Sequence, residues 1–119
     1  HGKEHDWIFT VSHHPFYSHG EANYNLTTML LDLFYNQSVD VHLAGHNHTY
    51  QRFIDEKHNW THVITAGGGA WMDSPRESPK NDVVSFDYHY MIWEVEGSSA
   101  KATAYLESGE ILDEFTLHV

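Results

Sequence analysis

Two histidines spaced two residues apart carry the strongest chemical signal in this sequence. His46 and His48 follow Gly45, directly after a stretch over residues 39–43 whose alternation of apolar and polar residues predicts a β-strand. Neighbouring side chains of an extended backbone point to opposite sides, so this pair can reach two points a few ångströms apart. Two metal ions roughly 3.5–4 Å apart fit that spacing. The alternative is that a chain with 12 histidines contains the spacing by chance.

The elements before this pair decide where it lies. A nearly continuous apolar run over residues 6–12 predicts a strand buried on both faces, which stops before Pro15. Apolar residues at helical spacing then predict a helix capped by Asn25 that ends near residues 36–38. Since the strand over 39–43 follows at once, we expect a parallel βαβ unit with a right-handed crossover.

This topology predicts a metal site at one edge of the sheet. Ligands of open α/β sheets bind at the carboxyl ends of the strands. His13 follows the first strand and His46 and His48 follow the second, so we expect these three side chains to converge. Gly45 suits the turn between them, because glycine adopts positive φ without a steric penalty. His42, just before the turn, is either a group that supports the site or a solvated strand residue.

The second half of the chain reads as antiparallel. Residues 50–54 and 60–66 predict a strand pair that turns at 55–59, and the glycines at 67–69 form either a simple turn or a close backbone approach to the site. Three more strands are expected over residues 85–95, 100–107 and 110–119. The predicted fold class is therefore α/β: a parallel βαβ unit followed by an antiparallel meander, in a two-sheet α+β sandwich.

Composition narrows the possible partners. The chain has 119 residues, enough for one domain or part of one, and its 17 acidic against 6 basic residues give a net charge of −11. This charge argues against nucleic acid and anionic membrane surfaces as partners. No apolar run is long enough for a membrane span, and no cysteine is present.

Sequons suggest a compartment. Asn-x-Ser/Thr motifs begin at Asn25, Asn36, Asn47 and Asn59. They favour a secreted or a lysosomal or vacuolar protein, although so short a motif also arises by chance. We expect glycosylation at Asn25, Asn36 and Asn59, but not at Asn47, which lies between the two histidines of the metal loop.

Three segments carry a resemblance to a known family. Residues 11–17 (VSHHPFY), 45–52 (GHNHTYQR) and 66–73 (AGGGAWMD) resemble, in this order, the motifs of calcineurin-like metallophosphatases. The purple, tartrate-resistant acid phosphatases are the most similar group within that superfamily. The resemblance implies a four-layer αββα fold, of which residues 1–119 form a single partial domain, the C-terminal half of the catalytic domain.

The resemblance also assigns roles. It implies that His13 and His46 bind a divalent ion and that His48 binds the second ion, so that the cofactor is iron paired with iron, zinc or manganese. His14 occupies the variable position of the His-x-Pro motif and receives no role. His19 is similar to a loop histidine that acts as general acid, and its alternative is an exposed loop residue. The implied activity is hydrolysis of phosphate monoesters at acidic pH.

This sequence lacks some of the metal-ligand motifs that the family resemblance implies. The family's first half supplies the remaining ligands, including a bridging aspartate in a Gly-Asp segment, and neither Asp6 nor Asp40 has that context. We therefore expect activity only with a second polypeptide that carries the N-terminal half, and weak metal binding by this chain alone. Two other functions remain open: a non-catalytic metallophosphatase-like module, and a histidine-rich metal-binding or scaffold protein.

Overall fold

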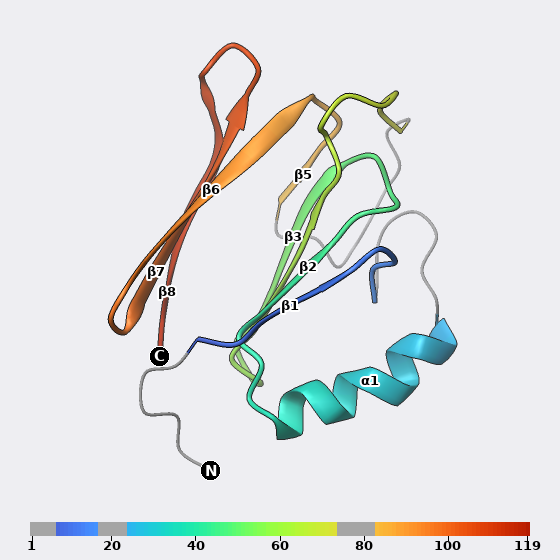
Figure 1. Cartoon of the computed structure of the whole chain (residues 1–119), viewed down its shortest axis with the longest axis vertical. Helices are drawn as coiled ribbons and strands as arrows, with labels where there is room; N and C mark the ends of the chain where they lie inside the picture. Colours follow the sequence, from blue (N-terminus) through green and yellow to red (C-terminus); the bar gives the residue numbers. More distant parts are fainter. Residues whose placement is uncertain (1–6, 17–23, 74–82) are drawn as a thin grey trace.

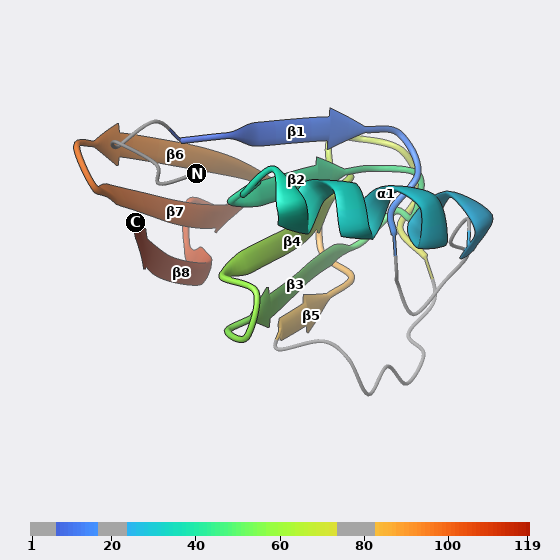
Figure 2. The ribbon, with the colours of Figure 1, turned by 90° about the horizontal axis from the view of Figure 1, so that it is seen from below.

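The chain folds into three layers (Figure 1). The computed structural model describes residues 7–16, 24–73 and 83–119. A single helix in this part of the chain, α1 (Tyr24–Asn36), covers one face of a five-stranded sheet, and a three-stranded sheet covers the other face (Figure 2). This helix is not long and apolar enough to cross a membrane. The predicted α/β class is confirmed.

The five-stranded sheet contains the parallel unit. Its strands lie in the order β1-β2-β4-β3-β5. Their bounds are β1 (Phe9–Ser12), β2 (Val41–Ala44), β3 (Tyr50–Asp55), β4 (Trp60–Thr65) and β5 (Val83–Ser85). β1 pairs with β2 and β2 with β4 in parallel, whereas β3 is antiparallel to β4 and β5. Because α1 connects β1 to β2, the predicted βαβ unit is confirmed.

The first strand differs from the prediction. Burial of β1 on both faces is wrong, since Val11 is 76% exposed. The reason is position: β1 is an edge strand, and among the described residues it has a neighbour on one side only. The ends of the next elements also shift. Helix α1 begins at Tyr24, one residue before the expected cap Asn25. Strand β2 begins at Val41, and the carboxylate of the buried Asp40 just before it accepts a hydrogen bond from the backbone N–H of Ile8 at 2.8 Å.

The three-stranded sheet is the predicted meander. It consists of β6 (His89–Glu96), β7 (Ser99–Leu106) and β8 (Ile111–His118), all antiparallel. The single strand expected over residues 85–95 is wrong, because the chain turns at Asp87 and crosses from one sheet to the other. The backbone N–H of Asp87 donates to the hydroxyl of Ser85 at 3.3 Å, and that hydroxyl donates to the Asp87 carboxylate at 2.8 Å.

Buried apolar clusters between the layers hold the fold together. Between α1 and the five-stranded sheet, Phe16, Val39 and Trp60 form a buried cluster. Between the two sheets, Tyr50 and Val63 pack against Ala104 of β7. Phe16 lies in the loop after β1 and is only 1% exposed. Its burial in the first core therefore holds that loop in place.

One polar cluster also joins the two sheets. The Tyr50 hydroxyl of β3 donates to Oδ2 of Asp113 in β8 at 2.6 Å. Arg52 donates to both carboxylate oxygens of Asp113, from Nε at 2.7 Å and from Nη2 at 3.2 Å. Burial and the bond to Asp113 raise the pKa of Tyr50, so its hydroxyl remains a donor. The residues directly after the histidine loop are thereby anchored to the opposite sheet.

Candidate metal centre

The loops after β1 and β2 meet at the carboxyl edge of the sheet. The backbone N–H of Gly45 donates to the carbonyl of His13 at 3.0 Å, which fixes the two loops relative to each other. The side chains meet as well: Nδ1 of His46 lies 3.2 Å from Nε2 of His13. The structure therefore brings together two of the three histidines that the sequence predicted to converge.

A third imidazole joins them. The ligand nitrogens of His13, His14 and His46 all lie within 4.8 Å of one another. In a continued strand His13 and His14 would point to opposite sides. Here the Ser12 hydroxyl donates to the carbonyl of His14 at 2.6 Å and bends the chain, so that both rings reach His46. Sequence reasoning set His14 aside, and the adjacent His-His pair before Pro15 was the available signal.

The backbone of this loop is strained at one of the three histidines. We expected positive φ at Gly45, but the left-handed position is His46, with φ of 66°. Such a conformation costs a residue with a Cβ on the order of 1–3 kcal/mol, and such outliers cluster at functional sites. It turns the His46 ring toward His13.

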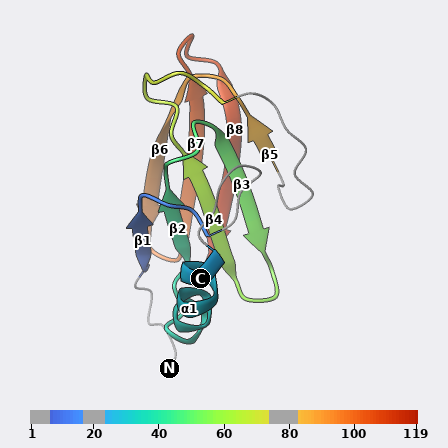
Figure 3. The ribbon, with the colours of Figure 1, turned by 90° about the vertical axis from the view of Figure 1, so that its right-hand side faces the viewer.

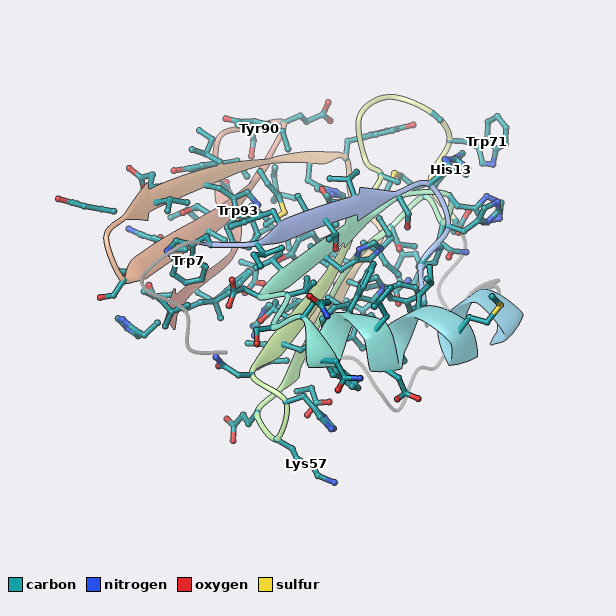
Figure 4. The ribbon with its side chains drawn as sticks, turned by 60° about the horizontal axis from the view of Figure 1, so that its bottom comes forward. Trp7, His13, Lys57, Trp71, Tyr90 and Trp93 are labelled. Atoms are coloured by element: carbon teal, nitrogen blue, oxygen red, sulfur yellow. The ribbon has the colours of Figure 1, made fainter. Side chains whose placement is uncertain are left out.

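His48 lies apart from this group. Its Nδ1 bonds to the carbonyl oxygen of Trp71 at 2.7 Å, so Nδ1 carries the proton and Nε2 is the nitrogen with a free lone pair. Its backbone N–H donates to Oδ2 of Asp73 at 3.2 Å. Among the described residues, the group that could hold one ion does not include His48. The His-x-His pair thus diverges, and Figure 4 shows Trp71 and His13 at the same end of the molecule.

Gly67, the first of the glycines at 67–69, leaves space for the side chain of another histidine, His89. A Cβ on Gly67 would overlap the ring of His89, whose backbone N–H donates to the Gly67 carbonyl at 3.2 Å. Nδ1 of His89 bonds to the carbonyl of Asp87 at 2.9 Å, and Nε2 lies 3.0 Å from the Thr65 hydroxyl. Burial lowers the pKa of His89 and keeps it neutral. Close packing therefore explains Gly67.

His42 lies in the core beneath α1 and supports the loop. It is 1% exposed, so the interpretation as a solvated strand residue is wrong. Its Nδ1 lies 2.7 Å from the Thr10 hydroxyl and its Nε2 lies 2.8 Å from the Ser12 hydroxyl. Because Ser12 donates its own hydrogen to His14, it accepts from Nε2 of His42. Burial lowers the pKa of His42 to about 4, which maintains this neutral form.

The remaining candidates are placed as follows. His19 lies outside the described residues, and for Asn25 the structure describes only the backbone, in the first turn of α1. Asn36 and Asn59 are exposed, as a glycan requires. Asn47 is buried, so the folded chain does not offer it for modification.

The donor set fits one divalent transition ion. Imidazole nitrogens suit zinc, copper, iron and nickel. Two imidazoles on a tetrahedral ion, each at about 2.0–2.1 Å, place their nitrogens roughly 3–3.4 Å apart. The separation of 3.2 Å between His13 and His46 matches that value. In the part of the chain that is described, no carboxylate belongs to the group.

Comparisons with known proteins agree with this architecture. No protein-family model matches the sequence. Purple acid phosphatase 7 of Arabidopsis thaliana is 30% identical over 117 residues, which cover 93% of this chain and 35% of the relative. The structure of purple acid phosphatase PPD1 from yellow lupin (Lupinus luteus) seeds superposes with a TM-score of 0.73 and 20% identity, over 94% of this chain and 25% of that one.

A second solved structure shares the fold. GAP50, described as the anchor in the inner membrane complex of Plasmodium, superposes with a TM-score of 0.84 and 21% identity, over 95% of this chain and 36% of that one. The homologous sequence and the shared fold confirm the resemblance to purple acid phosphatases that was seen in the sequence. The chain corresponds to a C-terminal portion of their fold. It spans about a third of the length of its Arabidopsis relative.

Proposed function

We propose that this chain supplies the histidine half of a dinuclear metal centre that hydrolyses phosphate monoesters, in the manner of an acid phosphatase. The observation that carries the proposal is the meeting of His13 and His46 at 3.2 Å across the carboxyl ends of two parallel strands. In the proposal these two side chains hold one ion. His48 holds the other through Nε2, since its Nδ1 is bonded to Trp71.

The proposed cofactor is an iron ion paired with iron, zinc or manganese. When bound, such an ion pair supplies a hydroxide nucleophile and neutralises charge on the phosphate oxygens. The chain's own contribution is to orient three imidazoles, and His42 and Ser12 hold the turn that carries His13. His19 is the proposed general acid for the leaving oxygen, a role that typically contributes 10²–10⁴-fold.

The missing ligands come, in this proposal, from a second polypeptide that carries the N-terminal half of the fold. Residues 1–119 are then a partial domain. Both sheets support this arrangement, because within residues 7–16, 24–73 and 83–119 β1 ends one sheet and β6 ends the other. These two edges lie on the same side of the molecule (Figure 3). Open edges of this kind pair readily with further strands.

A secretory route is proposed from the sequons. Asn36 ends α1 and Asn59 lies in the turn between β3 and β4, both exposed to solvent. A protein glycosylated at such sites is secreted, or is delivered to a lysosome or vacuole. Detection of glycans at Asn25, Asn36 or Asn59 by mass spectrometry of protein from its natural source tests this part of the proposal.

The decisive experiment measures turnover of p-nitrophenyl phosphate and metal content, for the chain alone and for the chain joined to its N-terminal half. We expect no turnover by the chain alone, and turnover with two metal ions in the joined protein. Turnover by the chain alone would refute the half-site, and a joined protein that folds but hydrolyses no ester would refute the phosphatase function.

A non-catalytic module is the second candidate. The described residues place no carboxylate among the clustered histidines to bridge two ions. The fold is also shared with GAP50, which is described as an anchor. Metal content separates the candidates: two ions in the joined protein indicate the enzyme, and one or none indicates the module.

The structure disfavours a histidine-rich binder with many weak sites. Three of the histidines in the described part of the chain, His42, His62 and His89, are buried in the core. Buried imidazoles with fixed neighbours are not available to ions from solvent, so the number of histidines overstates the number of ligands. A titration that shows many equivalent weak sites per chain would restore this third function.

A further inference from the structure

The group formed by His13, His14 and His46, called the edge triad below, differs from the ligand set that the family resemblance assigns. That set gives one ion two histidines of this chain, and the rest from the missing half. The structure adds the His14 imidazole, whose ring centroid lies 4.3 Å from that of His46 and 5.0 Å from that of His13.

Three features fix the backbone of the loops that carry the edge triad. The hydroxyl of Ser12 fixes the carbonyl of His14, and the N–H of Gly45 fixes the carbonyl of His13. On the far side of the loop, Pro15 and Phe16 are buried in the core. The backbone between these anchors has little freedom left to lose when a ligand binds, which favours binding.

The side chains of the edge triad can converge on one ion. His13 and His46 already lie at the separation that a tetrahedral ion requires. The widest separation in the group, at most 4.8 Å, exceeds the roughly 3–3.4 Å between ligands of one ion, and rotation of the exposed His14 side chain closes that gap. The net charge of −11 also favours a bound cation.

From this geometry we propose that the edge triad is a mononuclear metal site that the chain forms without any partner. His14 is its third ligand. Three imidazoles around Zn²⁺ or a similar divalent ion leave a fourth position open for water or an anion. The site shares two histidines with the proposed phosphatase centre, but it does not depend on the missing half or on catalysis. With this third ligand, the isolated chain is expected to bind one divalent ion more tightly than the weak binding expected from one or two histidines for each ion.

The test uses the metal-free 119-residue chain and Co²⁺, whose visible absorption reports the number and geometry of its ligands. We expect one Co²⁺ per chain with the intense absorption of a four-coordinate ion, and displacement by Zn²⁺. His14→Ala should weaken binding at least 10-fold and replace the intense spectrum by the weak one of a more hydrated ion. Circular dichroism confirms that the variant is folded, as we expect for an exposed side chain.

Two controls make the result specific. His48→Ala should bind Co²⁺ as the unchanged chain does, because His48 lies outside the edge triad. His58→Ala, in the turn between β3 and β4, should also have no effect. A His14→Ala variant with unchanged affinity and spectrum would overturn the proposal, and so would an equal loss in His48→Ala.

A second measurement identifies the ligands directly. In NMR spectra of the ring nitrogens, Zn²⁺ should shift one nitrogen each of His13, His14 and His46 and leave those of His48 unchanged. A shift limited to His13 and His46 would refute the role of His14. These outcomes are independent of phosphatase activity, so the phosphatase proposal can fail while the edge triad is confirmed, or the reverse.

Discussion

Two groups of histidines lie on or beside the same strands and behave as different kinds of residue. The edge triad lies at the carboxyl edge, where His13 and His14 are exposed and the imidazoles contact one another. The other group is the pair His42 and His62, which lies on β2 and β4 before the carboxyl ends of these strands. The two rings stack with their centroids 5.2 Å apart and are buried between α1 and the sheet. The difference shows that position along a strand decides whether a histidine side chain is exposed to solvent or buried in the core.

The physical cause is the neighbourhood of each ring. His42 stacks on Phe16 at 4.5 Å and bonds to two hydroxyl groups, and burial holds its pKa near 4. A ring in this position contributes packing and hydrogen bonds. At the edge, His13 and His14 are exposed, and their rings contact each other and the ring of His46.

The largest effect should come from His46→Ala in the chain joined to its N-terminal half. Loss of a ligand should lower phosphatase activity at least about 100-fold and reduce metal content. Initial rates with p-nitrophenyl phosphate and elemental analysis measure both quantities. His118→Ala, at the end of β8, is the matched control and should change neither. Full activity and metal content in His46→Ala would remove the functional distinction between the two groups.

The next largest effect should be on stability. His42→Ala should lower the free energy of unfolding by about 2–4 kcal/mol, because it opens a cavity and leaves the Thr10 and Ser12 hydroxyls without their ring partner. Urea unfolding of the chain measures this change. The paired variant His14→Ala should stay within about 0.5 kcal/mol of the unchanged chain. Equal losses in the two variants would contradict the contrast between core and edge.

Acid should destabilise the folded chain through the same buried ring, that of His42. The unfolded chain binds a proton at His42 near pH 6.5, whereas the folded chain does so only near pH 4. Stability should therefore fall as the pH drops through this window, by about 3 kcal/mol from His42, and the loss should level off below it. In the described part of the chain, the titratable ring of His62 stacks on His42.

A matched variant isolates this contribution. His42→Phe keeps an aromatic ring in the core but cannot take up a proton. Its free energy of unfolding, measured in urea at several pH values, should fall less steeply than that of the unchanged chain between pH 6.5 and pH 4. Parallel curves would show that His42 does not control acid sensitivity.

The smallest effect is expected at His58, which shares neither environment. It stacks on Tyr35 at 4.0 Å and pairs with Asp55 at 2.7 Å on the surface. Exposed pairs contribute little, so His58→Ala should change stability by about 0.5 kcal/mol and leave metal binding intact. Thermal unfolding and a Co²⁺ titration test both parts. A loss of bound metal would extend the site far beyond the carboxyl edge.

The elements were predictable where periodicity is strong. Apolar spacing predicted α1 and the order of strand and helix, and from that order the meeting of His13 and His46 followed. The exposed outer side of Val11 was not predictable, because it depends on which strand ends the sheet. The turn at Asp87 was missed because a side-chain bond to Ser85 makes it, within a run of apolar residues that continues on both sides.

The finer features of the site depended on side-chain direction. His14 could not be assigned from spacing, since a hydroxyl from Ser12 bends the chain that carries it. The burial of His42 follows from the coverage of β2 by α1, which an alternating pattern of apolar and polar residues does not show. His48 was expected to converge with His13 and His46, but among the described residues the group that could hold one ion does not include it.

The cluster of Tyr50, Arg52 and Asp113 has a consequence for how the molecule opens. It ties β3 in one sheet to β8 in the other by a bidentate ion pair and a short hydrogen bond. Separating the sheets would break the ion pair and the hydrogen bond at the same time, so the opening of β3 is coupled to the opening of β8. We therefore expect the backbone amides of β3 and β8 to exchange their hydrogens with deuterium at a common slow rate, as one cooperative unit.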